Sequence, residues 1–256
     1  MANDFSGDAN LQALYTCEGY LGNGNGLDDD STKGNDLTEV GNPDLEEILV
    51  KEGSKAMQTV DSQGMQFLAD ASLNADFPFK NGSSNQKLSV CFWAYPSAIN
   101  AYNFAVTKWY GGVAKRCWGC GLSSATKAWE LWIGYNGGAS SEIKGLAACT
   151  VAVDKWYHVA MTYDQDTKAY HIRVWDQTAT TVYDVSGTTT NAINIEDAGF
   201  AVSGNEDGAN YFRGVLDEVA VFNDILTTDE IDEIRNQTFG GGGGGGDGGL
   251  MFGSDF

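Results

Sequence analysis

Apolar and polar residues alternate along much of this chain, and a period of two is typical of β-strands with one buried face. The clearest case is residues 156–163, where one face carries Tyr157, Val159, Met161 and Tyr163. We expect that face to lie in a hydrophobic core.

The same pattern predicts a series of short strands. In chain order they cover residues 10–17, 56–60, 64–68, 88–95, 103–108, 113–122, 129–135, 143–151, 156–163, 169–175, 180–185, 199–203 and 215–222. Residues 88–95 are apolar on both faces, which predicts a central strand. Residues 164–168 separate two strands and predict a hairpin with a five-residue loop. After Pro43, the spacing of Leu45, Ile48 and Leu49 favours a helical segment.

One short helix is predicted near the end, over residues 226–237. Thr227 with Glu230 three residues later forms a capping box, and Leu226 with Ile231 can form a hydrophobic staple. Ile231 and Ile234 then give the helix one apolar face.

Beyond this helix the chain changes character, which divides it into a folded domain over residues 1–239 and a glycine-rich tail over residues 240–256. Seven consecutive glycines, 240–246, predict a flexible tether. The tail also holds four apolar residues, which form either a docking peptide for a partner or part of a dangling end. They are Leu250, Met251, Phe252 and Phe256.

Composition narrows the functional classes. The formal net charge of −20 disfavours partners with phosphate backbones, so we expect no nucleic-acid binding, and it weakens binding to anionic membranes. The sequence has no run of 18 apolar residues, so we expect no membrane-spanning helix. The first residues lack the basic and apolar regions of a secretion signal. The five cysteines lack framework spacing and are expected to be free, mostly buried thiols.

Several stretches, in this order, resemble the LamG-like domain family, whose fold is the concanavalin A-like jelly roll. They are residues 10–18, the Gly-Asn-Asp-Leu-Thr stretch at 34–38, Phe67 within residues 64–68, the strand at 88–95, Lys-Trp-Tyr-His-Val-Ala-Met-Thr-Tyr-Asp at 155–164, and residues 214–223. The resemblance implies an all-β sandwich, here with one short C-terminal helix and a glycine-rich tail. It also implies a binding protein of the kind found in phage structural and extracellular proteins.

Similar jelly rolls often hold a structural Ca²⁺ between the first and last strands. The resemblance places its ligands at Glu18, at the backbone carbonyl of Gly34 and at Asp217. Oxygen ligands suit Ca²⁺, although six or more are needed and only three are identified. The alternative is that Asp217 only caps the terminal strand.

No catalytic site is predicted. Glycosidases need two carboxylates on one face, whereas the central strands offer Glu130 alone. Exposed aromatic rings can instead stack on sugars, and the candidates are Trp109 and Tyr110, expected in a loop, together with Tyr211.

These observations favour a non-catalytic structural or adhesive protein of a virion, a capsid decoration or tail protein present in many copies. Its glycine-rich end would dock on neighbouring subunits at the virion surface. The alternative is a free extracellular module that binds surface glycans.

Overall fold

The computed structural model describes residues 5, 7–22, 24–59, 64–99, 102–111, 114–208 and 210–238. Almost all regular structure in these residues is β. The strands are β1 (Leu11–Tyr15), β2 (Thr38–Val40), β3 (Asp44–Glu46), β4 (Ala56–Thr59), β5 (Met65–Leu68), β6 (Lys87–Pro96), β7 (Tyr102–Tyr110), β8 (Lys115–Ser123), β9 (Trp129–Tyr135), β10 (Ser140–Gly145), β11 (Tyr157–Asp164), β12 (Ala169–Asp176), β13 (Thr181–Thr188), β14 (Phe200–Val202) and β15 (Gly214–Phe222). A 3₁₀ turn spans Asp70–Ser72, and helix α1 spans Thr228–Arg235.

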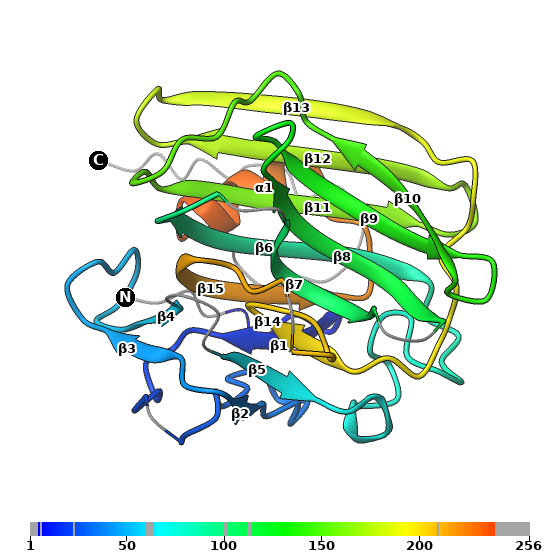
Figure 1. Ribbon diagram of the computed structural model, residues 1–256, viewed down its shortest axis with the longest axis horizontal. Coiled ribbons are helices and arrows are strands. Elements are labelled where there is room, and N and C mark those ends of the chain that lie inside the picture. Colours follow the sequence, from blue (N-terminus) through cyan, green and yellow to red (C-terminus); the bar gives the residue numbers. More distant parts are fainter. Residues whose placement is uncertain are drawn as a thin grey trace, which may run out of the picture.

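The strands form two antiparallel sheets that pack face to face (Figure 1). Eight strands make one sheet, in the order β13-β12-β11-β6-β15-β4-β3, with β1 pairing beside β4 along β15. Seven strands make the other, in the order β10-β9-β8-β7-β14-β5-β2. Neighbours that are distant in sequence, such as β6 with β15, give the crossed connections of a jelly-roll sandwich. The predicted all-β jelly roll is therefore confirmed.

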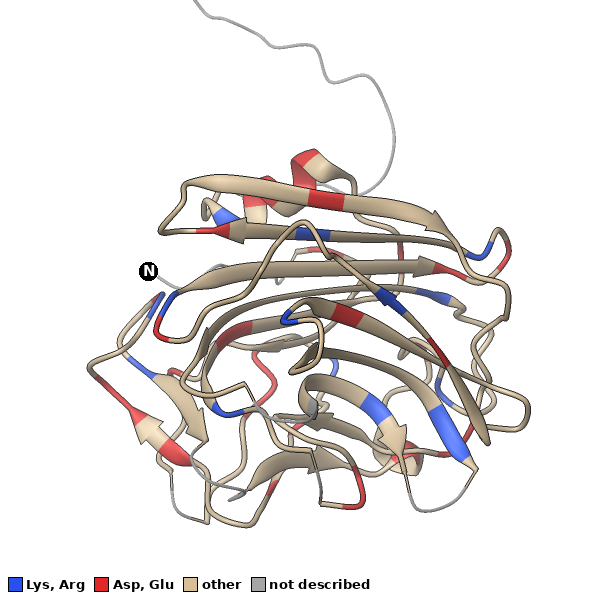
Figure 2. Ribbon diagram, turned by 45° about the horizontal axis from the view of Figure 1, so that its top comes forward, with Lys and Arg blue, Asp and Glu red and all other residues tan. Residues whose placement is uncertain are grey.

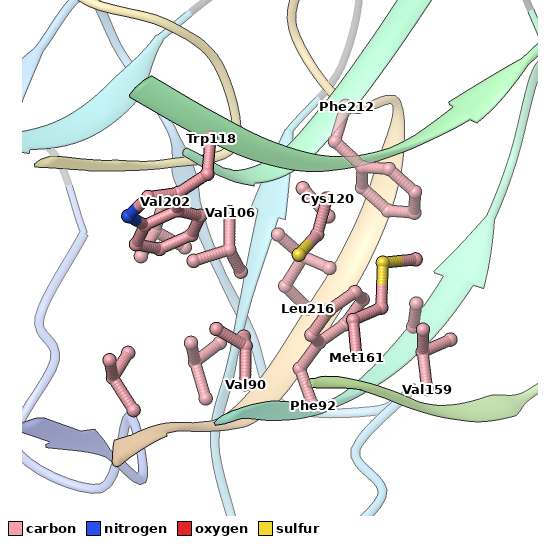
Figure 3. Close-up of a cluster of buried hydrophobic side chains, with 14 of the residues drawn as sticks. Val90, Phe92, Val106, Trp118, Cys120, Val159, Met161, Val202, Phe212 and Leu216 are labelled. Atoms are coloured by element: carbon pink, nitrogen blue, oxygen red, sulfur yellow. The ribbon is translucent and has the colours of Figure 1, made fainter. Parts of the chain in front are cut away.

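A single large hydrophobic core fills the space between the sheets. In Figure 3, side chains from β6, β11 and β15 face side chains from β7, β8 and β14. The predicted core face of β11 is confirmed, since Tyr157, Val159, Met161 and Tyr163 are all fully buried. Strand β6 lies between β11 and β15, which confirms its expected central place.

Helix α1 covers the outer face of the eight-stranded sheet. Ile231 and Ile234 pack there in a second cluster with residues that include Cys91, Ala160 and Leu226. The predicted capping box is present: the Glu230 N–H donates to the Thr227 hydroxyl, and the Thr227 N–H donates to the Glu230 carboxylate at 2.7 Å. The five cysteines are free and buried, as expected.

Three local predictions are wrong. Residues 44–49 form strand β3 and a loop rather than a helical segment, because Leu45 pairs with Met57 in the sheet. The strand expected over residues 143–151 is β10, which ends at Gly145 and is followed by turns. Asp164 pairs with Ala169, so the hairpin loop holds four residues rather than five.

One buried ion pair fixes β7 to the 3₁₀ turn. Lys108 is fully buried, and its ammonium lies 2.7 Å from the Asp70 carboxylate. It also donates to the carbonyls of Glu196, at 2.6 Å, and Ala198, at 2.7 Å. Such a charge is tolerated in the interior only because every donor has an acceptor.

Candidate functional site

A pocket of about 360 Å³ opens on the outer face of the seven-stranded sheet. Three aromatic side chains and several polar groups line it: Phe104 and Trp109 from β7, Arg116 from β8, Trp132 from β9, Ser141 from β10, and Gly111, Asn205, Asp207 and Asn210 from loops. A small apolar pocket with a few convergent polar groups is the usual form of a small-molecule site.

An irregularity in β7 places its two aromatic residues on the same face. In a regular strand, residues 104 and 109 would point to opposite sides of the sheet. The register with β8 shifts between Phe104 and Val106, and both Ala105 and Val106 pack into the core. This bulge brings Phe104 and Trp109 together on the outer face, where they form a cluster with Trp132.

Glycines on β8 make room for this cluster. A Cβ at Gly121 would approach the Phe104 ring to 3.0 Å, and one at Gly119 would approach it to 3.3 Å. The ring of Phe104 therefore lies directly over the backbone of β8. Its edge-to-face contact with Trp132 has a centroid distance of 5.4 Å, and Trp109 meets Trp132 at 6.0 Å.

The segment of residues 203–208 with Asn210 forms one wall of the pocket and is pinned along β7. The Ser203 N–H donates to Ala105, and the Glu206 N–H donates to Trp109. The Phe104 N–H donates back to the Asn210 carbonyl at 2.8 Å. These hydrogen bonds hold the exposed Asp207 carboxylate over the turn that follows β7, where a Cβ at Gly111 would lie 2.8 Å from it.

Two side chains of opposite charge, Arg116 and Asp207, line this pocket. The Arg116 guanidinium lies over the Trp109 ring, 5.6 Å from its centroid, and donates to the Ala139 carbonyl at 3.2 Å. Its Nε is buried and has no hydrogen-bond partner among the described residues. Asp207 is the one carboxylate among the described lining residues. Burial raises the pKa of the nearby Tyr211 hydroxyl, and the Asp207 charge acts in the same direction. A neutral ligand rich in hydroxyl groups suits this balance of charge.

Of the three aromatic residues predicted as ligand-binding, one lines the pocket. Trp109 lines the pocket, but it lies on β7 and is 4% exposed, so the expected loop position is wrong. Tyr110, also on β7, is half-buried and packs against the main core instead. Tyr211 pairs with Phe104 through an isolated bridge and follows Asn210 of the pocket wall.

Sequence reasoning missed Phe104, Arg116, Trp132 and the loop residues of the pocket. One signal for them was present: Gly119 and Gly121 alternate within a strand, and a glycine inside a strand often marks a close approach. The loop residues gave no such signal, because only the folded chain brings Asn205, Asp207 and Asn210 beside β7.

The two carboxylates expected to hold Ca²⁺ both accept backbone N–H groups from the loop at residues 51–55. Asp217 is fully buried, and its carboxylate accepts the N–H groups of Lys51, Glu52 and Glu218 at 2.9–3.0 Å. Glu18 accepts the N–H groups of Ser54 and Lys55. A Cβ added at Gly34, whose φ is +71°, would meet nothing within 4 Å.

A shared calcium site would have to compete with these hydrogen bonds. Among the described residues, no group of three or more His, Cys, Asp or Glu is arranged to hold a metal ion. Burial raises the pKa of Asp217 to about 7, against the effect of its hydrogen bonds from Glu52 and Lys51. Calcium binding stays a prediction, which thermal unfolding with and without added CaCl₂ would test.

The residues proposed for docking, Leu250, Met251, Phe252 and Phe256, lie outside the described part of the chain. No helix of the described residues is long and apolar enough to cross a membrane.

Solved structures with a similar fold include several binding domains. Domain 4 of AbnA, an extracellular arabinanase of family GH43 from Geobacillus stearothermophilus solved with arabinotriose, is 18% identical with a TM-score of 0.61. The match covers 89% of this chain and 98% of that one. The botulinum neurotoxin type G receptor-binding domain is 12% identical with a TM-score of 0.54, covering 90% of this chain and 52% of that one.

The Trypanosoma rangeli sialidase, solved with the inhibitor DANA, is 11% identical with a TM-score of 0.54, and the match covers 90% of this chain and 32% of the sialidase. These identities show a common fold. No curated protein sequence matches the chain. The sequence profile of the concanavalin A-like lectin/glucanases superfamily, Laminin_G_3, matches residues 70–232. This match spans more than half of the chain, from the 3₁₀ turn to helix α1, and the protein therefore belongs to that superfamily.

Proposed function

We propose that the protein is a non-catalytic carbohydrate-binding module, and that a sugar residue occupies the pocket between Trp109, Trp132 and Asp207. The observation that carries this proposal is the aromatic cluster of Phe104, Trp109 and Trp132 beside an arginine and a carboxylate. Sugars combine apolar C–H faces with pairs of hydroxyl groups. The aromatic side chains of the pocket suit the C–H faces, and Arg116 and Asp207 suit the hydroxyl groups.

Binding without cleavage follows from the carboxylates. Glycoside hydrolysis by the common mechanisms uses two of them flanking the bond, and Asp207 alone lines the described pocket. Glu130 lies on the same face of β9 as Trp132, but its carboxylate accepts the Thr126 hydroxyl at 2.9 Å. Burial raises the pKa of Glu130.

Glycan-array screening followed by calorimetry tests this proposal. Arabino-oligosaccharides are the first probes, because the similarly folded AbnA domain was solved with arabinotriose. Asp207→Ala removes an exposed carboxylate of the pocket and should weaken binding by about tenfold or more, the usual effect of losing hydrogen bonds to a charged group. Asp197→Ala removes an exposed carboxylate that pairs with Lys115 at 2.9 Å and serves as the matched control. Absence of binding to every glycan, or equal effects of the two variants, would contradict the proposal.

A second candidate function is that of a multi-copy structural or adhesive protein at a virion surface. The tail favours it, because a glycine tether followed by apolar residues can reach a neighbouring subunit. In that case the chain is stoichiometric in purified particles, and deletion of residues 240–256 abolishes its incorporation. Normal incorporation of the shortened chain would exclude docking by the tail. The glycan-binding module would instead act outside the cell without a particle.

A further inference from the structure

A second pocket, of about 320 Å³, lies on the opposite side of the sandwich, beside the end of helix α1. Its lining is aromatic and cationic: Lys51, Trp93, Trp175, Gln177, Arg235 and Asn236. The glycan proposal makes no use of this pocket.

Strand pairing builds the aromatic part of this pocket. His158 on β11 pairs with Trp93 on β6 and with Trp175 on β12, so the three side chains form a row across the outer face of the eight-stranded sheet. His158 is buried against Trp93, with ring centroids 5.0 Å apart. The two tryptophans are thereby held at fixed positions on either side of His158.

A cation lies over each tryptophan. The Lys51 ammonium is 4.2 Å from the Trp93 ring centroid, and the Arg235 guanidinium is 4.5 Å from the Trp175 ring centroid. Arg235 also pairs with Asp232 at 3.2 Å, whereas Lys51 makes no ion pair within the described residues. In a chain with a net charge of −20, a pocket with two cations in its wall favours an anionic occupant.

Acidic groups nearby are already engaged. The Glu52 carboxylate accepts the indole N–H of Trp93 at 2.8 Å, and Asp217 accepts backbone N–H groups of the same loop. Asp232 bonds Arg173 at 2.6 Å as well as Arg235. The ammonium of Lys51 is therefore the charge best placed to take a further carboxylate.

We propose that this pocket binds the end of the same chain, residues 250–256. That segment supplies Phe252 and Phe256 as apolar partners for the half-buried Trp175, and Asp255 as a carboxylate for Lys51. Residues 239–256 contain two aspartates and no basic residue, so their charge complements the pocket.

The position of the tail favours docking within one molecule. Helix α1 ends at Arg235, and Arg235 and Asn236 both line the pocket, so the residues that lead into the tail lie at its rim. Nine of the ten residues 240–249 are glycine, which allows the chain to reverse direction. A flexible tether of this length gives an effective concentration on the order of millimolar, so even a weak contact is populated.

A peptide of residues 249–256, labelled at its N-terminus, tests this proposal by fluorescence anisotropy against two full-length proteins. Phe252→Ser with Phe256→Ser should leave the pocket vacant and able to bind the peptide. The wild-type chain should bind the peptide at least about tenfold more weakly, because its own tail competes. Failure of the double variant to bind the peptide, or equal binding by both proteins, would overturn the proposal.

Further substitutions, each made in the double variant, locate the contact. Lys51→Gln and Arg235→Gln should each weaken peptide binding several-fold and reduce its salt dependence. Lys87 is an exposed lysine that lines a different pocket. Lys87→Gln should therefore leave the peptide affinity and its salt dependence unchanged. Peptide binding that neither pocket variant alters would place the contact elsewhere and refute the assignment. Sedimentation velocity completes the test: concentration-dependent association that the wild type shows and the double variant lacks would place the tail in a second copy.

Discussion

His158 is a buried histidine that stays neutral in the folded protein. Burial lowers its pKa from the ordinary 6.5 to about 3, and the Arg235 charge adds to the effect. Between these values the unfolded chain binds a proton that the folded chain does not. The free energy of unfolding should therefore fall by about 1.4 kcal/mol per pH unit from this group as the pH drops below 6.5. Urea unfolding of wild type and His158→Phe between pH 7 and pH 4 checks this, and an identical slope for both proteins would contradict it.

At the same scale, single residues of the site show what the sequence could and could not reveal. Trp109 was predicted as a ligand-binding residue and lines the pocket, but the bulge at Ala105 that turns it to the outer face has no sequence signature. Lys108 would be expected on the surface from its charge alone, whereas Asp70 and two carbonyls retain it inside. Arg116 and Asp207 line the same pocket only in the folded chain, so neither spacing nor periodicity could predict that they share it.

Among the elements, helix α1 depends on its cap. Thr227→Ala removes the hydroxyl that accepts the Glu230 N–H, and an N-cap of this kind contributes about 1 kcal/mol. We expect that decrease in the free energy of unfolding, measured with urea at neutral pH. Thr227→Ser keeps an accepting hydroxyl and should lose only a small part of this free energy of unfolding. Equal losses in the two variants would show that the cap hydrogen bond contributes little.

Elements with strong local patterns were predictable, and those held by long-range pairing were not. The capping box and the alternation of residues 156–163 act within one segment, so the sequence alone shows them. Strands β2 and β3 have three residues each and lie at sheet edges, where pairing with β5 and β4 makes them extended. The spacing of Leu45, Ile48 and Leu49 suggested a helical segment, yet the exposed Ile48 has no core to face. Tertiary pairing therefore outweighed local periodicity here.

For the molecule as a whole, motif order was enough to predict the fold, since the six stretches, taken from both ends of the chain, fall in the same sandwich. The ligand was not predictable in this way, because a fold of this kind supports many sites. The pocket is built from the outer faces of four strands and from two loops, and outer faces are free to vary without loss of the core.

The excess of acidic groups gives a last prediction for the whole molecule. Figure 2 shows that acidic residues are spread over strands, loops and helix α1 rather than gathered in one segment of the ribbon. With a net charge of −20, their mutual repulsion should destabilise the compact state, and added salt should screen it. The melting temperature should therefore rise when NaCl is increased from about 20 to about 500 mM, by roughly 2–4 °C for each kcal/mol of repulsion removed. Calorimetry at neutral pH checks this. A melting temperature that stays constant or falls would mean that attractive ion pairs, such as Arg173 with Asp184 and Asp232, outweigh the repulsion.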